Sequence, residues 1–253
     1  MISKIPTTNE GFKSLGLALG LYQKELGFFR YVASEIKVRI PECYVNRAEN
    51  GTDFVLILED LAPMRAGNLL ESCTYFEAEL ALATVATLHA RWWEDPRLEE
   101  FSEWLPTPGD AYFEILKGSY FGSVEKFHSH FGYLVTPEIT EPVNRGAADY
   151  DRLVAVAIGA RPHTFIHGDF RLDNMMFGDS PEADPFALLD WQFPFKANPL
   201  WDVIYFLGGN FDAEWRRANE QALLTSRHSA LVDAGVTRHS TTISDLSASE
   251  FLT

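Results

Sequence analysis

Residues 165–177 of this 253-residue chain read FIHGDFRLDNMMF, a polar loop between two apolar runs. The β-branched and aromatic residues on either side predict short strands over residues 164–166 and 175–177. Asp169 and Asn174 stand five positions apart in the loop. Because loops placed by rigid strands often carry functional side chains, the stretch predicts a compact polar site beside a small sheet.

Asp190 provides a second carboxylate for this site. It ends the apolar run over residues 186–189, sixteen positions after Asn174. Phosphoryl transfer needs a carboxylate that orients the attacking hydroxyl and accepts its proton, and oxygen ligands that hold Mg²⁺ against nucleotide phosphates. Asp169 and Asn174 have the base-to-metal-ligand spacing of the kinase loop H-R-D-x-x-x-x-N, and Asp190 follows as the D-F-G aspartate does. Each piece alone is common, but the three in this order predict catalytic machinery.

The segments around these residues resemble one family. Residues 165–177 and 189–192 (LDWQ) resemble the aminoglycoside phosphotransferase and choline kinase superfamily, most closely its ecdysteroid-kinase-like branch and bacterial relatives. Residues 88–93 (LHARWW) look like a helix end of that branch, and residues 56–61 (LILEDL) look like its hinge. The resemblance covers nearly the whole chain. It implies an α+β, protein-kinase-like two-lobed fold, with an incomplete β-rich N-terminal lobe and a mostly helical C-terminal lobe.

The resemblance also implies a reaction and a set of site residues. It predicts a phosphotransferase that moves the γ-phosphoryl group of ATP, with Mg²⁺, onto a hydroxyl of a small molecule. By this likeness Asp169 is the catalytic base, and Asn174 and Asp190 bind Mg²⁺. Residues of the hinge and of the strand after the loop are assigned to the nucleotide: Glu59, Asp60, Leu61 and Met176.

Glu25 lies on the apolar face of a predicted helix over residues 15–36, between Leu21 and Phe28. An unpaired carboxylate in that position is costly, so it needs a cation. Lys4 in the preceding short strand is the natural partner, because strand and helix should pack together. The kinase Lys–Glu pair has this arrangement, and its lysine also holds the nucleotide phosphates, which assigns Lys4 and Glu25 to the nucleotide site. The alternative is that Glu25 lies in solvent at the edge of the face.

Two further residues are expected to support the loop. Asp202 falls in the first turn of a helix that opens at Asn198-Pro199, where a helix N-terminus stabilises a carboxylate. The resemblance gives Asp202 the role of supporting the catalytic loop. His167 is expected to hold the shape of the loop through a hydrogen bond, and not to carry protons.

Apolar periodicity orders the chain as strand, helix, two strands and then mostly helices. Before the catalytic loop, strands are predicted over residues 1–5, 44–47 and 54–58. Further helices are predicted over residues 74–93, 110–131, 136–158, 200–207 and 214–234. Asn50-Gly51 predicts a hairpin turn between the second and third strands. This order predicts a partial N-terminal lobe over residues 1–60 and a helical lobe, with the catalytic loop and metal-binding strand, over residues 61–253.

Composition and charge limit the partners. The chain is 46% hydrophobic and 13% aromatic, which is enough for a substantial core, and its unbroken apolar runs are too short to span a bilayer. A net charge of −15 argues against general affinity for nucleic acid or anionic membranes. Two cysteines give no disulfide framework, and the N-terminus has no signal-peptide pattern. We expect a cytoplasmic enzyme with a small-molecule hydroxyl substrate; the substrate's identity and the oligomeric state stay open.

The sequence departs from the family pattern at its start. If Lys4 is the nucleotide lysine, the two strands and the glycine-rich loop that precede it in the family are missing, and the chain has no G-x-G-x-x-G. The chain is therefore expected to be N-terminally truncated. One alternative function is a truncated or decayed kinase-fold protein with weak or no catalysis. Another is a metal-dependent hydrolase built on His167, Asp169 and Asp190, which does not explain the spacing of Asn174.

Overall fold

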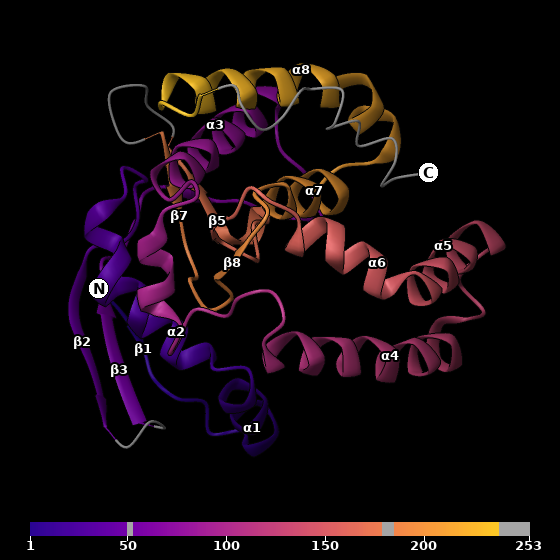
Figure 1. Cartoon of the computed structure of the whole chain (residues 1–253), viewed down its shortest axis with the longest axis horizontal. Helices are drawn as coiled ribbons and strands as arrows, with labels where there is room; N and C mark the ends of the chain where they lie inside the picture. Colours follow the sequence, from indigo (N-terminus) through magenta and orange to yellow (C-terminus); the bar gives the residue numbers. More distant parts are fainter. Residues whose placement is uncertain (50–52, 179–184, 238–253) are drawn as a thin grey trace.

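The computed structural model of the protein describes residues 1–49, 53–178 and 185–237. A small antiparallel sheet lies on one side, beside the N-terminus, and long helices occupy the other side (Figure 1). The predicted turn at Asn50-Gly51 lies outside the described residues. Within the described part of the chain, no helix is long and apolar enough to cross a bilayer.

The N-terminal sheet has the strand order β1-β3-β2, and both pairs are antiparallel. Its strands are β1 (Ile2–Lys4), β2 (Cys43–Glu49) and β3 (Asp53–Leu58). All three agree with the predicted strands. Alternate residues of β3 point to the same face and are buried there: Phe54, Leu56 and Leu58. This face packs on Tyr22 and Leu26, so the sheet is fixed against the first helical segment.

The first helical segment is broken where a single helix is predicted. It consists of α1 (Glu10–Ala18), α2 (Leu21–Gly27), a π-helical turn (Phe28–Val32) and a 3₁₀ turn (Ala33–Glu35). Gly20 between α1 and α2 has a φ of 64°, in the left-handed region that glycine adopts without steric penalty. The left-handed residue stops α1 and redirects the chain. The predicted single helix over residues 15–36 is therefore wrong, although Glu25 stays buried in α2.

The longer helices form the other side of the molecule. They are α3 (Tyr75–Arg91), α4 (Ala111–Phe131), α5 (Pro137–Ala148), α6 (Tyr150–Val154), α7 (Leu200–Gly209) and α8 (Ala213–Asp233). α3 begins with a capping box, in which Thr74 and Glu77 each accept the other's backbone N–H. α3 packs along α8, while α4, α5 and α6 lie far from the N-terminal sheet (Figure 1). The predicted helix over residues 136–158 is divided at Asp149 into α5 and α6.

Two small sheets surround the predicted loop. Their strands are β4 (Arg65–Ala66), β6 (Met175–Phe177) and β7 (Phe186–Leu188) in one, and β5 (Thr164–Ile166) and β8 (Phe195–Ala197) in the other. β5 and β6 are the strands predicted on either side of the loop. β4 and β8 are not predicted, because two or three residues carry no readable periodicity. They are recognised by their antiparallel pairing in the structure: β4 pairs with β6, and β8 pairs with β5.

The main core joins the N-terminal segment to the region of the loop. Phe28, just after α2, stacks on Trp191 with ring centroids 3.8 Å apart. Trp191 also lies beside Phe165 of β5, with centroids 6.2 Å apart. All three side chains are fully buried. Because large aromatic side chains bury much apolar area, this contact fixes the helix that carries Glu25 relative to the predicted catalytic loop.

Candidate active site

A cavity of about 330 Å³ lies between the N-terminal sheet and the segments around β6 and β7. Its wall includes every residue that the sequence assigns to nucleotide or metal binding: Lys4, Glu25, Glu59, Asp60, Leu61, Asn174, Met176 and Asp190. Leu58, Phe29 and Trp191 add apolar surface to the wall. A cavity with an apolar wall and a few convergent polar groups is the usual form of a small-molecule site.

Lys4 forms the polar centre of this cavity. Its Nζ atom lies 2.5 Å from Oε1 of Glu25 and 3.0 Å from Oδ1 of Asp190. Nε2 of Gln192 donates to the other Glu25 oxygen at 3.1 Å. The predicted ion pair is therefore present, and the alternative of a solvent-exposed Glu25 is wrong, because its side chain is 2% exposed.

Burial and charge act against each other in this group. Desolvation raises the pKa of Glu25, and the Lys4 cation opposes that rise without cancelling it. Desolvation alone would lower the pKa of Lys4. The carboxylates of Glu25 and Asp190 outweigh it and raise the pKa of Lys4 instead. Lys4 is thus held as a cation between two carboxyl groups.

Asn174 holds the Asp169 carboxylate. Its Nδ2 atom donates to Oδ2 and to the backbone oxygen of Asp169, both at 2.9 Å. Because the amide nitrogen faces Asp169, the amide oxygen is left for the cavity that Asn174 lines. Asp169 stands at the edge of the cavity, one hydrogen bond away. The two residues that the sequence pairs by spacing are therefore also in direct contact.

Hydrogen bonds join the loop to the residue before Asp190. The backbone N–H of Leu189 donates to the carbonyl of Asn174 at 2.8 Å. Nε2 of His167 donates to the carbonyl of Leu189, also at 2.8 Å. This is the kind of hydrogen bond predicted for His167. A hydrolase that used His167 to carry protons would need an imidazole in contact with solvent, and this one is fully buried.

Two residues of the site have left-handed backbone conformations, Gly168 with a φ of 83° and Asp190 with a φ of 60°. A Cβ atom at Gly168 would lie 2.0 Å from the backbone oxygen of Phe193, so only glycine fits. Asp190 carries a side chain in this region, at a cost on the order of 1 kcal/mol. Backbone strain of this kind is concentrated at functional sites, where it holds a side chain in a fixed position. This makes Asp190 a strong candidate for a metal ligand.

Asp202 organises the backbone of the loop. Its carboxylate oxygens accept the N–H groups of His167 and Gly168, both at 2.9 Å. Nε2 of His89 lies 3.0 Å from Oδ2 of Asp202. Burial would raise the pKa of Asp202, but the hydrogen bond from His89 and the other donors outweigh it and lower the pKa. The position of Asp202 in the first turn of α7 also stabilises the carboxylate form. Together, these contacts are those expected of a residue that supports the loop.

His89 and Arg227 extend this support and are not predicted from the sequence. His89 is fully buried in α3, and Nη2 of Arg227 in α8 lies 3.3 Å from its Nδ1 atom. Burial lowers the pKa of His89, so the ring is a neutral imidazole whose proton sits on Nε2 and faces Asp202. The segment LHARWW, residues 88–93, contains this histidine, but the sequence indicates only a helix end there.

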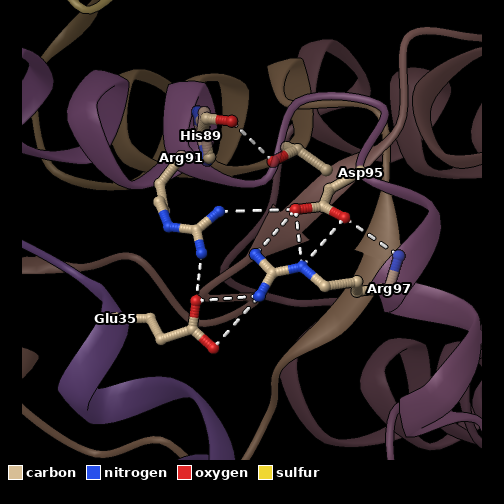
Figure 2. A network of polar contacts seen from close by, with 6 residues as sticks. Glu35, His89, Arg91, Asp95 and Arg97 are labelled. Atoms are coloured by element: carbon tan, nitrogen blue, oxygen red, sulfur yellow. Dashed lines mark hydrogen bonds and ion pairs between the residues drawn. The ribbon is translucent and has the colours of Figure 1, made fainter.

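A second network joins the N-terminal helical segment to the end of α3 (Figure 2). Nη1 of Arg97 lies 3.0 Å from Oε2 of Glu35, and its Nη2 lies 2.9 Å from Oδ2 of Asp95. Arg91 contacts both carboxylates as well. The two guanidinium groups lie 4.6 and 4.9 Å from the centroid of Trp92, a cation–π arrangement. The network therefore connects the segment after α2 to the C-terminal end of α3.

The predicted hinge is fixed by Arg39. Two of its guanidinium nitrogens lie 2.7 and 2.8 Å from the two carboxylate oxygens of Glu59, a bidentate pair. The hydrogen bonds from Arg39 lower the pKa of Glu59. The backbone N–H of Glu59 donates to Glu42 at 2.8 Å. Because the side chain and the N–H of Glu59 already have partners, the backbone carbonyl of Glu59 is the group that a ligand in the cavity could use.

Tyr205 and Arg171 flank Asp169 and are not predicted from the sequence. Burial, and then the neighbouring carboxylate of Asp169, raise the pKa of Tyr205 to about 12. Arg171 lies close enough to both residues for its charge to act on them, and it forms an ion pair with Asp173. Tyr205 belongs to α7, three residues after Asp202. That helix therefore supplies both the support of the loop and a side chain beside the predicted base.

Solved structures with a similar fold include several phosphotransferases. The chain matches the GDP and kanamycin complex of APH(2")-IIia with a TM-score of 0.55 at 15% identity, over 85% of this chain and 73% of that chain. It matches spectinomycin phosphotransferase APH(9)-Ia, in complex with ADP and spectinomycin, with a TM-score of 0.53 at 14% identity, over 95% and 69%. Macrolide 2'-phosphotransferase MphH from Brachybacterium faecium matches with a TM-score of 0.49 at 13% identity, over 88% of this chain and 66% of that chain.

Sequence comparison points the same way. Residues 142–238, which contain the catalytic loop, Asp190 and Asp202, match the model of the Ecdysteroid kinase-like family. A search of curated proteins finds no match. The two structures with the higher TM-scores show that the chain has the kinase-like α+β fold that the sequence predicts. The part of the resemblance that rests on the catalytic loop and Asp190 therefore agrees with the match of residues 142–238 to the Ecdysteroid kinase-like family, and the fold it implies is confirmed.

Proposed function

We propose that the chain is a small-molecule kinase, an ATP- and Mg²⁺-dependent phosphotransferase that moves the γ-phosphoryl group onto a hydroxyl. One observation carries the proposal: Lys4, Glu25, Asn174 and Asp190 converge on one cavity, and Asn174 binds Asp169 at its edge. A lysine paired with a glutamate, two oxygen ligands for a metal and a carboxylate base are the parts that phosphoryl transfer uses.

The donor set fits Mg²⁺. Asp190 offers a carboxylate and Asn174 an amide oxygen on the wall of the same cavity. Mg²⁺ is commonly held by one or two protein oxygens together with phosphates and waters. When bound there, the ion would neutralise charge on the transferred phosphoryl group. Lys4, 3.0 Å from Asp190, would contribute its positive charge at the same end of the cavity.

The rest of the cavity suits a nucleotide. Leu58, Leu61 and Met176 supply surface for a flat base, and the carbonyl of Glu59 is a hydrogen-bond acceptor beside them. Glu25 fixes the Lys4 amino group, so the phosphate end of the site is already organised. Two of the structures that share this fold contain GDP or ADP, which supports nucleotide binding.

Asp169 is the proposed base. Its carboxylate would orient the acceptor hydroxyl and take up the proton as the oxygen attacks phosphorus. Asn174 fixes one oxygen of this carboxylate, and Asp202 fixes the backbone of the two residues before it. The base is thus held in place before the substrate arrives, which lowers the cost of reaching the reactive geometry.

Two conservative substitutions test the proposal. Asp169→Asn keeps the shape of the residue and should preserve Mg-ATP binding, while phosphate transfer falls by at least about 100-fold. In Asp190→Asn the new residue is one that readily adopts the left-handed backbone conformation, so the fold should be kept. The variant should weaken both Mg²⁺-dependent ATP binding and phosphate transfer. Binding is measured by calorimetry, and transfer from labelled ATP is measured to a panel of small alcohols and to water.

The outcomes separate the proposal from its alternatives. Retained turnover in either variant contradicts the assignment of the base or of the metal ligand. Mg-ATP binding by the wild type without any release of phosphate would indicate a kinase-fold protein that binds nucleotide and does not catalyse transfer. Absence of Mg-ATP binding would contradict both functions.

A further inference from the structure

A cleft of about 590 Å³ lies where α3 packs along α8 (Figure 1). It is larger than the nucleotide cavity and shares no described lining residue with it. Most of the described lining consists of small side chains from α3 and from the end of α8: Ala83, Thr87, Ala90, Ala230 and Ala234. Because these side chains are short, they leave the space between the helices open and cover it mainly with methyl groups.

Four charged residues complete the described lining, and two of them already neutralise each other. Glu35 and Arg91 belong to the network of Figure 2, in which Arg91 pairs with Glu35 and with Asp95. Arg97 is the second cation of that network and contacts both carboxylates. The network holds two positive and two negative charges, so it leaves no charge for a ligand to neutralise.

The other two charged residues of the cleft are Lys37 and Asp233. Both side chains are exposed, and within the described part of the chain neither has an ion pair or a hydrogen bond. Lys37 belongs to the segment after the 3₁₀ turn, whereas Asp233 belongs to α8. The cleft therefore offers one unpaired cation and one unpaired carboxylate, and they come from different walls.

The end of α8 adds to the negative charge on its wall. Asp233 is the last residue of that helix, and the last turn contains no basic residue. The C-terminal end of a helix carries a partial negative charge, which a cation placed there would offset. Asp233 and the helix end therefore both favour a positively charged group on this wall, while Lys37 favours a negatively charged group on the other.

We propose that this cleft binds a small zwitterion, whose ammonium group pairs with Asp233 and whose carboxylate pairs with Lys37, with a short apolar chain between them. The chain would lie against the alanine methyl groups. A ligand with one charge would leave either Lys37 or Asp233 without a partner, and a polycation or a dianion would meet a like charge. The inference does not depend on the proposed kinase function, because the two cavities share no described residue.

The test uses full-length protein labelled at the alanine methyl groups and observed by nuclear magnetic resonance at constant ionic strength. The probes are 6-aminohexanoate, hexylammonium and hexanoate, which share a six-carbon chain and differ in charge. The zwitterion should shift the methyl signals of Ala83, Ala230 and Ala234. It should bind at least about threefold more tightly than either ion, because it forms two exposed ion pairs where each ion forms one. Ala222 of α8 is the reference, because it is exposed and lies outside the described lining.

Three variants place the charges. Lys37→Gln and Asp233→Asn should each lower the affinity for 6-aminohexanoate to that of a singly charged probe. The double variant Lys37→Glu/Asp233→Lys keeps one charge of each sign, so it should bind the zwitterion again in the reversed direction. Lys126→Gln is the matched control, because Lys126 is exposed on α4 and does not line the cleft.

Four results would overturn the inference. They are no shift with 6-aminohexanoate, a singly charged probe that binds as tightly as the zwitterion, an unchanged affinity in Lys37→Gln or Asp233→Asn, and a double variant as weak as the single variants. An effect of Lys126→Gln equal to that of Lys37→Gln would also contradict it, because the loss would then follow from net charge and not from the cleft.

Discussion

The amino group of Lys4 lies 3.0 Å from the carboxylate of Asp190, a residue 186 positions further along the chain. The same amino group lies 2.5 Å from Glu25. Lys4 therefore joins the N-terminal sheet, α2 and the segment after β7 at one point. A residue in this position has two effects that experiments can separate, one on stability and one on ligand binding.

The stability effect is tested by Lys4→Met. This change leaves Glu25 as a buried carboxyl group without its cation, so the free energy of unfolding should fall by about 3 kcal/mol. The double variant Lys4→Met/Glu25→Leu should recover part of that loss, because it removes the buried charge as well. Urea denaturation of the two single variants and the double variant measures the coupling. A Lys4→Met protein as stable as the wild type would show that the pair contributes nothing to folding.

Asp202→Asn tests the support of the catalytic loop. The amide nitrogen of Asn would face a backbone N–H of the loop and leave it without an acceptor, so we expect a loss of about 2 kcal/mol. Asp212→Asn is the matched control, because Asp212 caps α8 and Asn caps a helix equally well. Thermal unfolding of the two variants checks the contrast. Equal melting temperatures would mean that the buried carboxylate does not hold the loop.

Glu35→Gln in the network of Figure 2 should have a smaller effect. The side chains of Glu35 and Arg97 are 33% and 40% exposed, so water screens their attraction. We expect a loss of at most about 1 kcal/mol, measured by urea denaturation and decreasing as salt is added. A loss as large as that of Lys4→Met would show that the exposed network contributes as much to folding as the buried pair.

The central residues of the site could be predicted from the sequence because their spacing is local. Asp169 and Asn174 share one loop, and that loop brings them into contact. The need of Glu25 for a cation could also be predicted, because a carboxylate on an apolar helical face is costly to bury without a partner. In each case the physical requirement is visible within a few residues of the position itself.

Other residues gave no such signal, because their roles depend on partners from distant elements. His89 looks like any residue near a helix end until Asp202 and Arg227 are placed beside it. Tyr205 has an ordinary position on α7, and its importance comes from the nearby carboxylate of Asp169, which helps raise the pKa of Tyr205. The break at Gly20 is similar, since a glycine inside an apolar pattern does not show whether its backbone will be left-handed.

Lys24 gives the protein a predictable dependence of stability on pH. Its side chain is 2% exposed, and its Nζ atom lies 3.4 Å from the ring centroid of Tyr112. Within the described part of the chain, this nitrogen has no hydrogen-bond partner. Burial lowers the pKa of Lys24 to about 7. An unfolded lysine has a pKa of about 10.4, so between these two values the unfolded state binds more protons than the folded state.

The free energy of unfolding should therefore rise with pH between these two pKa values. Lys24 contributes at most about 1.4 kcal/mol per pH unit to this rise. Lys24→Met removes the titration and keeps the length of the side chain, so it should be more stable than the wild type at neutral pH. The difference should shrink as the pH is raised toward that of an unfolded lysine. Urea denaturation at several pH values checks this, with Lys37→Met at an exposed lysine as the control for loss of one charge. A constant difference between Lys24→Met and the wild type would show that Lys24 keeps its proton when buried, held by the face of Tyr112.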